Sequence, residues 1–231
     1  MITLHSSYSR NHDDITGRED SFVHTIDFIN KLISVKQKIC VHFVPMQINS
    51  EELEDLIEFL VDKKIPKIQI LRFMPQGRGL INKEWLSLQK DATINLLEST
   101  LRFDGREDII VNLGHPGDFR FLLNDSYKPK QCNAGIIQCM VMVNGDIMPC
   151  PAFADLKDWT AGNIFNNSLE EIWTDSEIFI RLREFDFRRL NGECRGCGFL
   201  AICQGRCPAE RIRNNKNFYL GPDPGCPKDA I

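Results

Sequence analysis

The sequence predicts an α/β fold with a parallel β-sheet over residues 1–128, followed by a small cysteine-rich domain over residues 129–231. Segments of strand length alternate with amphipathic helical segments through the first part, and this alternation is typical of βαβ units. Of the nine cysteines, only Cys40 lies in the first 131 residues. The second part has short elements joined by turns, so the two parts are expected to fold by different means.

Strand-like segments occur in the first part at residues 2–5, 39–44, 67–73 and 109–112. The near-continuous apolar run at 39–44 is the pattern of a parallel strand buried on both faces. In such sheets the ligand site lies at the C-terminal ends of the strands. The candidate ligand loops are therefore residues 5–7, 45–47 and 74–79.

Helices are expected between these strands. One covers residues 21–34, where apolar residues recur at helical spacing. A second follows Asn49, which is expected to cap it with Glu52 three residues later. A third covers residues 83–101, and the polar segment 6–17 is expected to be a loop closed by Gly17, in which Asp13 and its neighbour Asp14 form caps or turns.

In the second part, residues 139–143 and 146–148 flank Asn144-Gly145, which is a strong local signal for a β-hairpin. Ser168 and Glu171 form a capping box that opens a helix extending to about residue 185. This helix can bury the apolar residues Ile172, Trp173, Ile180 and Leu182. After Asn191 the chain is dense in cysteine and glycine, and a segment of this kind needs more than a hydrophobic core to hold it.

The composition limits the classes of function. With 42% hydrophobic and 26% charged residues, the chain resembles globular proteins. No apolar run approaches the roughly 18 residues of a membrane-spanning helix, and the first residues lack the basic and apolar regions of a secretion signal. A formal net charge of −4 argues against a nucleic-acid partner. We therefore expect a cytoplasmic chain without a membrane or nucleic-acid partner, whose reduced thiols serve metal binding or redox chemistry.

The eight late cysteines are Cys132, Cys139, Cys150, Cys194, Cys197, Cys203, Cys207 and Cys226. Two thiolates separated by two residues can reach one metal centre across a tight turn. A four-thiolate zinc site is one interpretation, although zinc ribbons usually leave about 15–20 residues between cysteine pairs. Disulfides or core thiols are a second, although the total of nine is odd and the segment 194–207 is polar. Two cubane iron–sulfur clusters, each held by four thiolates, are the third.

The spacing over residues 132–226 resembles the signature of the SPASM domain of radical S-adenosylmethionine enzymes. That signature reads Cys-x12-Gly-x4-Cys here, then Cys-x2-Cys-x5-Cys-x3-Cys, then a last cysteine. The first part resembles the barrel of the same enzymes in the segments 12–17 and 73–79, and in Asn49 followed by Glu52 and Leu53. The resemblance implies the C-terminal half of a partial (β/α)6 TIM-like barrel, followed by a SPASM domain with a β-hairpin and a helix.

The resemblance assigns the cysteines to two auxiliary [4Fe–4S] clusters. It gives Cys132, Cys150 and Cys207 to the first cluster, and it gives the second cluster its ligands Cys194, Cys197, Cys203 and Cys226. Cys139 is either a further ligand of the first cluster or a core thiol. Cys40 is expected to be a core residue.

Contacts with S-adenosylmethionine are also implied, provided that a missing N-terminal half of the barrel is supplied. The candidate residues follow the first and third strands and are His5, Ser6, Ser7, Phe73, Met74 and Pro75. Plain turn formation is the alternative role of Ser6 and Ser7. The Cys-x3-Cys-x2-Cys motif that holds the catalytic cluster in these enzymes does not occur in the sequence. The chain is therefore expected to be inactive alone.

The implied function is modification of a peptide or protein side chain by 5'-deoxyadenosyl-radical chemistry. The auxiliary clusters would transfer electrons or bind the substrate, and the protein would orient the reactants. The implied partners are a peptide or protein substrate, a reductant such as ferredoxin or flavodoxin, and a separate N-terminal barrel half. The alternative is a non-catalytic iron–sulfur electron-transfer or peptide-binding module that works with a separate partner, or a zinc-binding structural domain.

Overall fold

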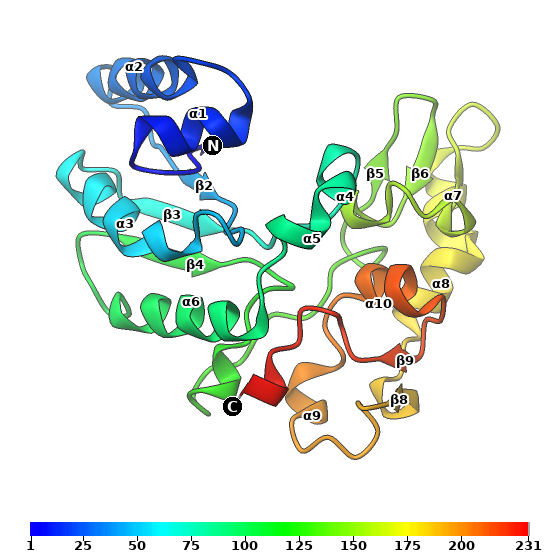
Figure 1. The fold of residues 1–231 in the computed structure, drawn as a ribbon. Helices are drawn as coiled ribbons and strands as arrows, with labels where there is room; N and C mark the ends of the chain where they lie inside the picture. Colours follow the sequence, from blue (N-terminus) through cyan, green and yellow to red (C-terminus); the bar gives the residue numbers. More distant parts are fainter. Residues whose placement is uncertain (231) are drawn as a thin grey trace. The chain divides into compact units, whose positions relative to one another are not determined.

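The computed structural model describes residues 1–230 (Figure 1). The chain forms two compact units. Unit 1 comprises residues 1–127 together with the described residues 227–230, and unit 2 comprises Lys128–Cys226. No helix within the described residues is long and apolar enough to cross a membrane.

Unit 1 contains a parallel sheet with the strand order β1-β2-β3-β4. Its strands are β1 (Ile2–Thr3), β2 (Val41–Phe43), β3 (Lys67–Ile70) and β4 (Ile110–Leu113). Its α-helices are α1 (Ser9–Thr16), α2 (Ser21–Ser34), α3 (Leu53–Asp62), α4 (Arg78–Ile81), α5 (Lys83–Leu86) and α6 (Lys90–Arg102). The predicted α/β architecture with a parallel sheet is confirmed, and α2 has the bounds that the sequence predicts.

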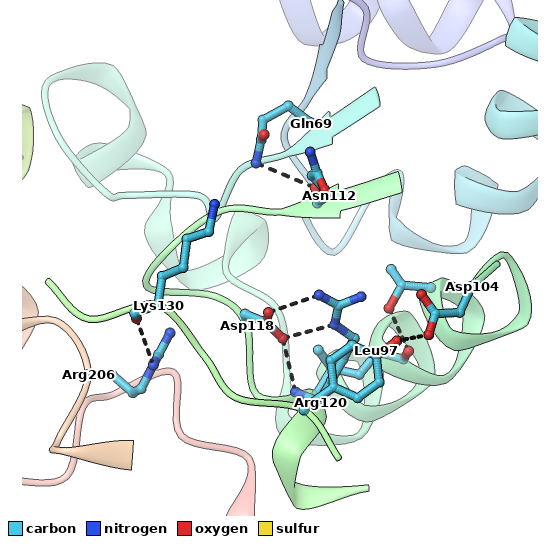
Figure 2. Close-up of polar contacts among 10 residues, drawn as sticks. Gln69, Leu97, Asp104, Asn112, Asp118, Arg120, Lys130 and Arg206 are labelled. Atoms are coloured by element: carbon cyan, nitrogen blue, oxygen red, sulfur yellow. Dashed lines mark hydrogen bonds and ion pairs between the residues drawn. The ribbon is translucent and has the colours of Figure 1, made fainter. Parts of the chain in front are cut away.

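The core of unit 1 lies between one face of the sheet and the helices α2, α3 and α6. Val41 and Phe43 of β2 and Ile68 of β3 are fully buried there, together with Leu56 and Leu60 of α3. Because side chains alternate along a strand, the register pair of His42 and Gln69 points to the opposite face. Gln69 also aligns with Asn112, and its Nε2 donates to the Asn112 carbonyl at 3.4 Å (Figure 2).

The prediction of a loop over residues 6–17 is wrong, because residues 9–16 form α1. This helix is polar and short, so it carries no apolar periodicity that the sequence could reveal. Gly17 ends it in the left-handed conformation and donates its N–H to the Asp13 carbonyl at 2.8 Å. The Asp13 carboxylate accepts the backbone N–H groups of Asp20 and Phe22 at the start of α2, which confirms the predicted capping role of Asp13.

Asn49 occupies the N-cap position of the 3-10 turn that leads into α3, as predicted, but its side chain makes no capping hydrogen bond. Its Oδ1 accepts the Met46 N–H at 2.6 Å, and its Nδ2 donates to the carbonyls of His5 and Val44. The side chain therefore joins the loop after β2 to the loop after β1. Helix α3 begins at Leu53, after a short 3-10 turn over Ser50–Glu52.

The helix predicted over residues 83–101 is two helices, α5 and α6, separated by an extended link at residues 87–89. A contact with Gln47 explains the break. The Gln47 N–H donates to the carbonyl of Leu86, and the Gln47 Oε1 accepts the N–H of Gln89. These backbone groups therefore bond outside their own helix.

The segment after β4 is held by an ion pair within unit 1. The Asp118 carboxylate accepts Nε and Nη2 of Arg120, each at 2.9 Å (Figure 2). The guanidinium also lies over the ring of Tyr127, 4.3 Å from its centroid. Tyr127 donates its hydroxyl to Asp104. This network connects the segment 118–127 to Asp104 within unit 1.

Unit 2 begins with a three-stranded antiparallel sheet of β5 (Met140–Val141), β6 (Asp146–Met148) and β7 (Gly162–Asn163). The predicted hairpin is confirmed. Gly145 has a φ of +84°, and a Cβ there would lie 2.6 Å from the ring of Phe165, so glycine is required on two counts.

The predicted capping box of Ser168 and Glu171 is also confirmed. The helix breaks at Ser176 into α7 (Leu169–Asp175) and α8 (Glu177–Arg183). This break changes the buried face, so that Phe179 is fully buried whereas Ile180 is 38% exposed. Ile172 and Leu182 are buried as predicted, and Trp173 is half-buried.

The last part of unit 2 contains β8 (Asn191–Gly192), α9 (Leu200–Cys203), α10 (Pro208–Asn215) and β9 (Leu220–Gly221). Strands β8 and β9 pair in parallel, with Gly192 opposite Gly221. Short 3-10 turns elsewhere in the chain are Arg120–Leu122, Pro151–Phe153, Lys157–Trp159, Phe187–Arg189 and Lys228–Ala230.

Candidate functional site

The late cysteines lie in turns and at element ends rather than inside long helices or strands. Cys194 follows β8, Cys203 ends α9, Cys207 precedes α10, and Cys226 follows β9. The parallel pairing of β8 with β9 brings the segments that carry Cys194 and Cys226 together. The backbone of Gly221 lies directly against Cys194, since a Cβ at Gly221 would be 2.3 Å from the Cys194 Sγ.

Electrostatic interactions link four of these thiols, and we call them the Cys194 group: Cys194, Cys197, Cys203 and Cys226. The sulfur of Cys194 interacts electrostatically with the thiols of Cys197 and Cys226. The thiol of Cys203 interacts with those of Cys194 and Cys226. Burial raises the pKa of the Cys203 thiol to about 12.

Cys132 and Cys150 lie near each other, away from the strand pair β8 and β9 in sequence. Burial raises the pKa of the Cys150 thiol to about 11, and the neighbouring Cys132 raises it further. Burial also raises the pKa of Cys132. Such thiols stay protonated at neutral pH, because a buried thiolate needs a metal or a cation to stabilise its charge.

Cys207 is fixed by a buried carboxylate. Its backbone N–H donates to Oδ2 of Asp223 at 2.9 Å, and Asp223 is 2% exposed. The other carboxylate oxygen accepts the N–H of Gly225, and the Asp223 carbonyl accepts the N–H of Cys226 at 2.9 Å. One residue thus holds the backbone at two cysteines.

A buried cation lies among the same cysteines. Arg211 of α10 has no exposed surface, and its charge interacts with the thiols of Cys194, Cys203 and Cys207. It also interacts with the thiol of Cys132. Its Nη1 and Nη2 atoms donate to backbone carbonyls, whereas Nε has no hydrogen-bond partner among the described residues.

Among the residues that the structure describes, no two cysteines form a disulfide bond. Within residues 1–230, no three His, Cys, Asp or Glu side chains gather around a point where a single metal ion could sit. Cys139 is half-buried and packs against the cluster of Ile147, Ile172 and Phe179. Cys40, expected in the core, is only half-buried, with its thiol directed to the Val41 carbonyl at 3.8 Å.

In unit 1, His5, Ser6 and Ser7 follow β1. Ser6 is fully buried and donates its hydroxyl to Glu52, which also accepts the side-chain amide of Asn11. Burial and the nearby His12 imidazole lower the pKa of His5 to about 4. Both His5 Nδ1 and Ser7 Oγ are buried without a hydrogen-bond partner among the described residues.

Phe73, Met74 and Pro75 follow β3, and all three are half-buried. In the sheet order β1-β2-β3-β4, strand β2 separates β1 from β3. Because the strands are parallel, residues 5–7 and 73–75 leave the same edge of the sheet. The sequence-predicted residues therefore share an edge, with one strand between the two sets.

Comparison with known proteins identifies the cysteine-rich segment. Residues 132–198 match the family model SPASM, described as an iron-sulfur cluster-binding domain. The chain is 25% identical over 226 residues to the PqqA peptide cyclase of Xanthomonas axonopodis pv. citri, covering 95% of this chain and 58% of that protein. It is 33% identical over 168 residues to the mycofactocin maturase MftC of Mycobacterium tuberculosis (strain ATCC 25618 / H37Rv), covering 69% of this chain and 39% of that one.

The chain is a homologue of radical SAM/SPASM enzymes and contains a SPASM domain. Among solved structures it is similar to native anSMEcpe with bound AdoMet and Cp18Cys peptide, with a TM-score of 0.70 and 17% identity. That match covers 99% of this chain and 64% of anSMEcpe, and at this identity it shows the fold alone. The chain spans about half the length of the curated relatives it matches, and it aligns with their C-terminal portions.

The SPASM assignment agrees with the donor chemistry of unit 2. A four-thiolate iron–sulfur cluster is an anionic group, and a buried guanidinium with an unpartnered Nε is suited to stabilise one. The half-buried or buried thiols around Arg211 are of the chemical type that such a cluster takes as ligands. The residues present therefore fit the group that the family implies.

Some residues of the site carry no signal in the sequence. Arg211 and Asp223 match no spacing motif, and contacts between distant residues bury them. Glu52 has a signal in its position three residues after Asn49, which we interpreted as a helix cap. Its carboxylate instead meets Ser6 and Asn11, more than 40 residues away.

Proposed function

We propose that unit 2 binds two auxiliary [4Fe–4S] clusters. The Cys194 group would hold one of them. Cys132, Cys150 and Cys207 would hold the other, with Cys139 as the candidate for its fourth ligand. The observation that carries this proposal is that Cys194 interacts electrostatically with Cys197 of its own turn and with the distant Cys226, and that Cys203 interacts with Cys194 and Cys226.

The contacts around the thiols support this assignment. Asp223 ties the backbone of Cys207 to that of Cys226, which would belong to different clusters. Because Asp223 bonds to both residues, it fixes the positions of the two ligand sets relative to each other in a segment that has little hydrophobic core. Metal–ligand bonds would then stabilise this segment, as core packing stabilises larger domains.

When bound, such clusters supply one-electron transfer or an iron site for substrate. The chain supplies the surroundings. Arg211 places a positive charge beside the thiolates, and the half-buried thiols limit the access of water. The raised pKa of Cys150 and of Cys203 implies that these thiols release protons when they become ligands.

We further propose that unit 1 is part of a (β/α)6 barrel whose edge at residues 5–7 and 73–75 contacts S-adenosylmethionine. The unpartnered Ser7 Oγ and His5 Nδ1 support this, because buried polar atoms of this kind serve a polar ligand well. In a polypeptide that also supplies a Cys-x3-Cys-x2-Cys motif, Ser7→Ala should weaken S-adenosylmethionine binding in calorimetry. Exposed Ser34→Ala is the control and should leave binding unchanged.

The whole activity that we propose is radical modification of a peptide or protein side chain. The substrate would be a peptide, by analogy with the PqqA peptide cyclase and with the peptide-bound anSMEcpe structure. An electron donor such as ferredoxin or flavodoxin would reduce the clusters. A polypeptide that contains this chain and also supplies a Cys-x3-Cys-x2-Cys motif, assayed with candidate precursor peptides by mass spectrometry, tests this activity, and an unchanged peptide mass in the presence of assembled clusters contradicts it.

The cluster assignment is tested by anaerobic reconstitution. The protein should take up about eight iron and eight sulfide per chain. Cys203→Ala should lose about half of the iron, whereas Cys40→Ala, outside unit 2, should lose none. About one zinc and no sulfide would overturn the proposal in favour of a structural zinc domain.

Cys139 can be assigned by the same measurement. Cys139→Ala should lower the iron count or alter the spectrum of the first cluster if its thiol is a ligand. An unchanged iron count and spectrum would assign Cys139 to the packing around Ile147, Ile172 and Phe179.

A further inference from the structure

Arg211 is a fully buried arginine whose guanidinium is held in place by the backbone. Nη1 donates to the Gly205 carbonyl at 2.6 Å, and Nη2 donates to the Phe218 carbonyl at 3.2 Å. The ring of Phe185 lies 5.1 Å from the guanidinium carbon. These contacts fix the orientation of the planar group, so Nε–H has a fixed direction as well.

The charge of Arg211 has anionic surroundings, since Asp223 interacts with it electrostatically. Burial of a guanidinium costs several kcal/mol in general, and anionic neighbours offset that cost. The Nε–H group has no acceptor among residues 1–230.

The thiols around Arg211 come from both proposed ligand sets. Cys132 and Cys207 belong to the first set, whereas Cys194 and Cys203 belong to the Cys194 group. Arg211 therefore lies where one positive charge can act on two clusters. Arg206, which is 3% exposed, also interacts with a thiol of each set, Cys132 and Cys203, but Arg211 has no exposed surface.

The chain makes room for this guanidinium at Gly205. A Cβ on Gly205 would lie 2.3 Å from Nη1 of Arg211, and its φ of +72° also favours glycine. Gly205 lies between Cys203 and Cys207 in the Cys-x3-Cys segment. The loop from Cys203 to Cys207 carries one ligand of each set, and it thus provides the space that the Arg211 guanidinium occupies.

We propose that Arg211 sets the reduction potentials of both auxiliary clusters, by holding one fixed positive charge near the ligands of each and donating its Nε–H to a cluster sulfur. This inference rests on the proposed two-cluster function. Each cluster becomes more negative when it accepts one electron, and a nearby cation stabilises that reduced state. Charge and hydrogen bonds to sulfur are established determinants of such potentials.

The test is a redox titration of the reconstituted protein with dithionite as the electron donor, followed by electron paramagnetic resonance. Arg211→Met removes the charge, Arg211→Gln keeps polar groups for the two carbonyls, and Arg211→Lys keeps the charge. Arg188→Met is the matched control, because Arg188 is an exposed arginine of the same unit, paired with Asp186. Iron and sulfide are counted for every variant before titration.

The two neutral variants should shift the equilibrium for reduction at least tenfold toward the oxidised state, which corresponds to about 59 mV for one electron. Arg211→Lys should shift it less, and Arg188→Met should not shift it. A fully loaded Arg211→Met or Arg211→Gln protein with wild-type potentials overturns the role of Arg211 alone. Wild-type protein that takes up no sulfide overturns the two-cluster function and this inference together.

A second measurement keeps the inference testable if the neutral variants fail to assemble clusters. The reduced wild-type protein should show, by electron–nuclear double resonance, an exchangeable proton coupled to a cluster, and this signal should disappear in D2O. Arg211→Lys, which lacks Nε, should lose that proton while keeping its iron. Persistence of the same proton in Arg211→Lys overturns the assignment of the hydrogen bond to Nε.

Discussion

Oδ2 of Asp223 accepts a hydrogen bond from the backbone N–H of Cys207 at 2.9 Å. The same residue accepts the N–H groups of Gly225 and Cys226 through its other carboxylate oxygen and its carbonyl. Asp223 therefore orders the turn between β9 and Cys226 around Cys207. Both cysteines are proposed ligands, so this single residue couples the geometry of the two ligand sets through its side chain and its backbone carbonyl.

Asp223→Ala should destabilise unit 2, because it leaves the buried N–H of Cys207 and the partly buried N–H of Gly225 without acceptors. An unsatisfied buried polar group costs about 1–3 kcal/mol. Urea unfolding of the cluster-free protein should show this loss, and reconstituted protein should hold less iron. Asp186→Ala is the control, because Asp186 accepts the N–H of Arg188 in a similar turn at the surface. Equal losses in the two variants would contradict the role of Asp223.

Gly221→Ala should displace Cys194, because a Cβ at this position would lie 2.3 Å from the Cys194 sulfur. Crowding of this kind costs about 1–3 kcal/mol in a packed region. The variant should lose about half of the iron, since the Cys194 group holds one of the two proposed clusters. Gly198→Ala, beside Cys197 and facing open space, should keep the full iron count. Full iron in Gly221→Ala would show that Cys194 can move without loss of its cluster.

The sequence predicted those elements whose signals are local. Helix α2 follows from apolar residues at helical spacing, and the hairpin at Gly145 follows from the Asn-Gly pair. Helix α1 was missed because its residues are polar, and the break between α5 and α6 was missed because Gln47, about 40 residues earlier, bonds to both of its ends. Contacts between distant residues leave no periodic trace in the sequence.

The candidate site could also be predicted only in part. The spacing of the cysteines indicated an iron–sulfur domain, and the match to the SPASM model over residues 132–198 confirms that domain. Arg211 and Asp223 could not be predicted, because their roles depend on burial and on partners such as Gly205 and Cys207. Motif spacing identifies the groups that bind a cofactor. The folded chain determines the charges and hydrogen bonds around them.

Glu52→Ala should destabilise unit 1 more than its neighbour Glu54→Ala. Glu52 accepts the hydroxyl of buried Ser6 and the side-chain amide of Asn11, whereas Glu54 pairs with Arg102 at the surface. Loss of the buried acceptor costs about 1–3 kcal/mol, and an exposed ion pair contributes about 0.2–1 kcal/mol. Thermal and urea unfolding measure the difference. A larger loss in Glu54→Ala would show that the Glu52 contacts do not stabilise the loop after β1.

The stability of unit 1 should fall in mild acid because of His5. Burial and the His12 imidazole lower the pKa of His5 from 6.5 to about 4, so the folded state favours the neutral imidazole. The unfolded chain binds the proton more readily, and the stability that His5 contributes is therefore present above about pH 6.5 and is lost as the pH falls toward 4. The full effect is at most about 3 kcal/mol, and partial solvent access reduces it.

Urea unfolding at pH 7 and pH 4.5 should show a smaller acid-induced loss of stability in His5→Asn than in the wild type. The exposed His24→Asn control should keep the wild-type loss. An unchanged acid-induced loss in His5→Asn would assign the pH dependence to other groups.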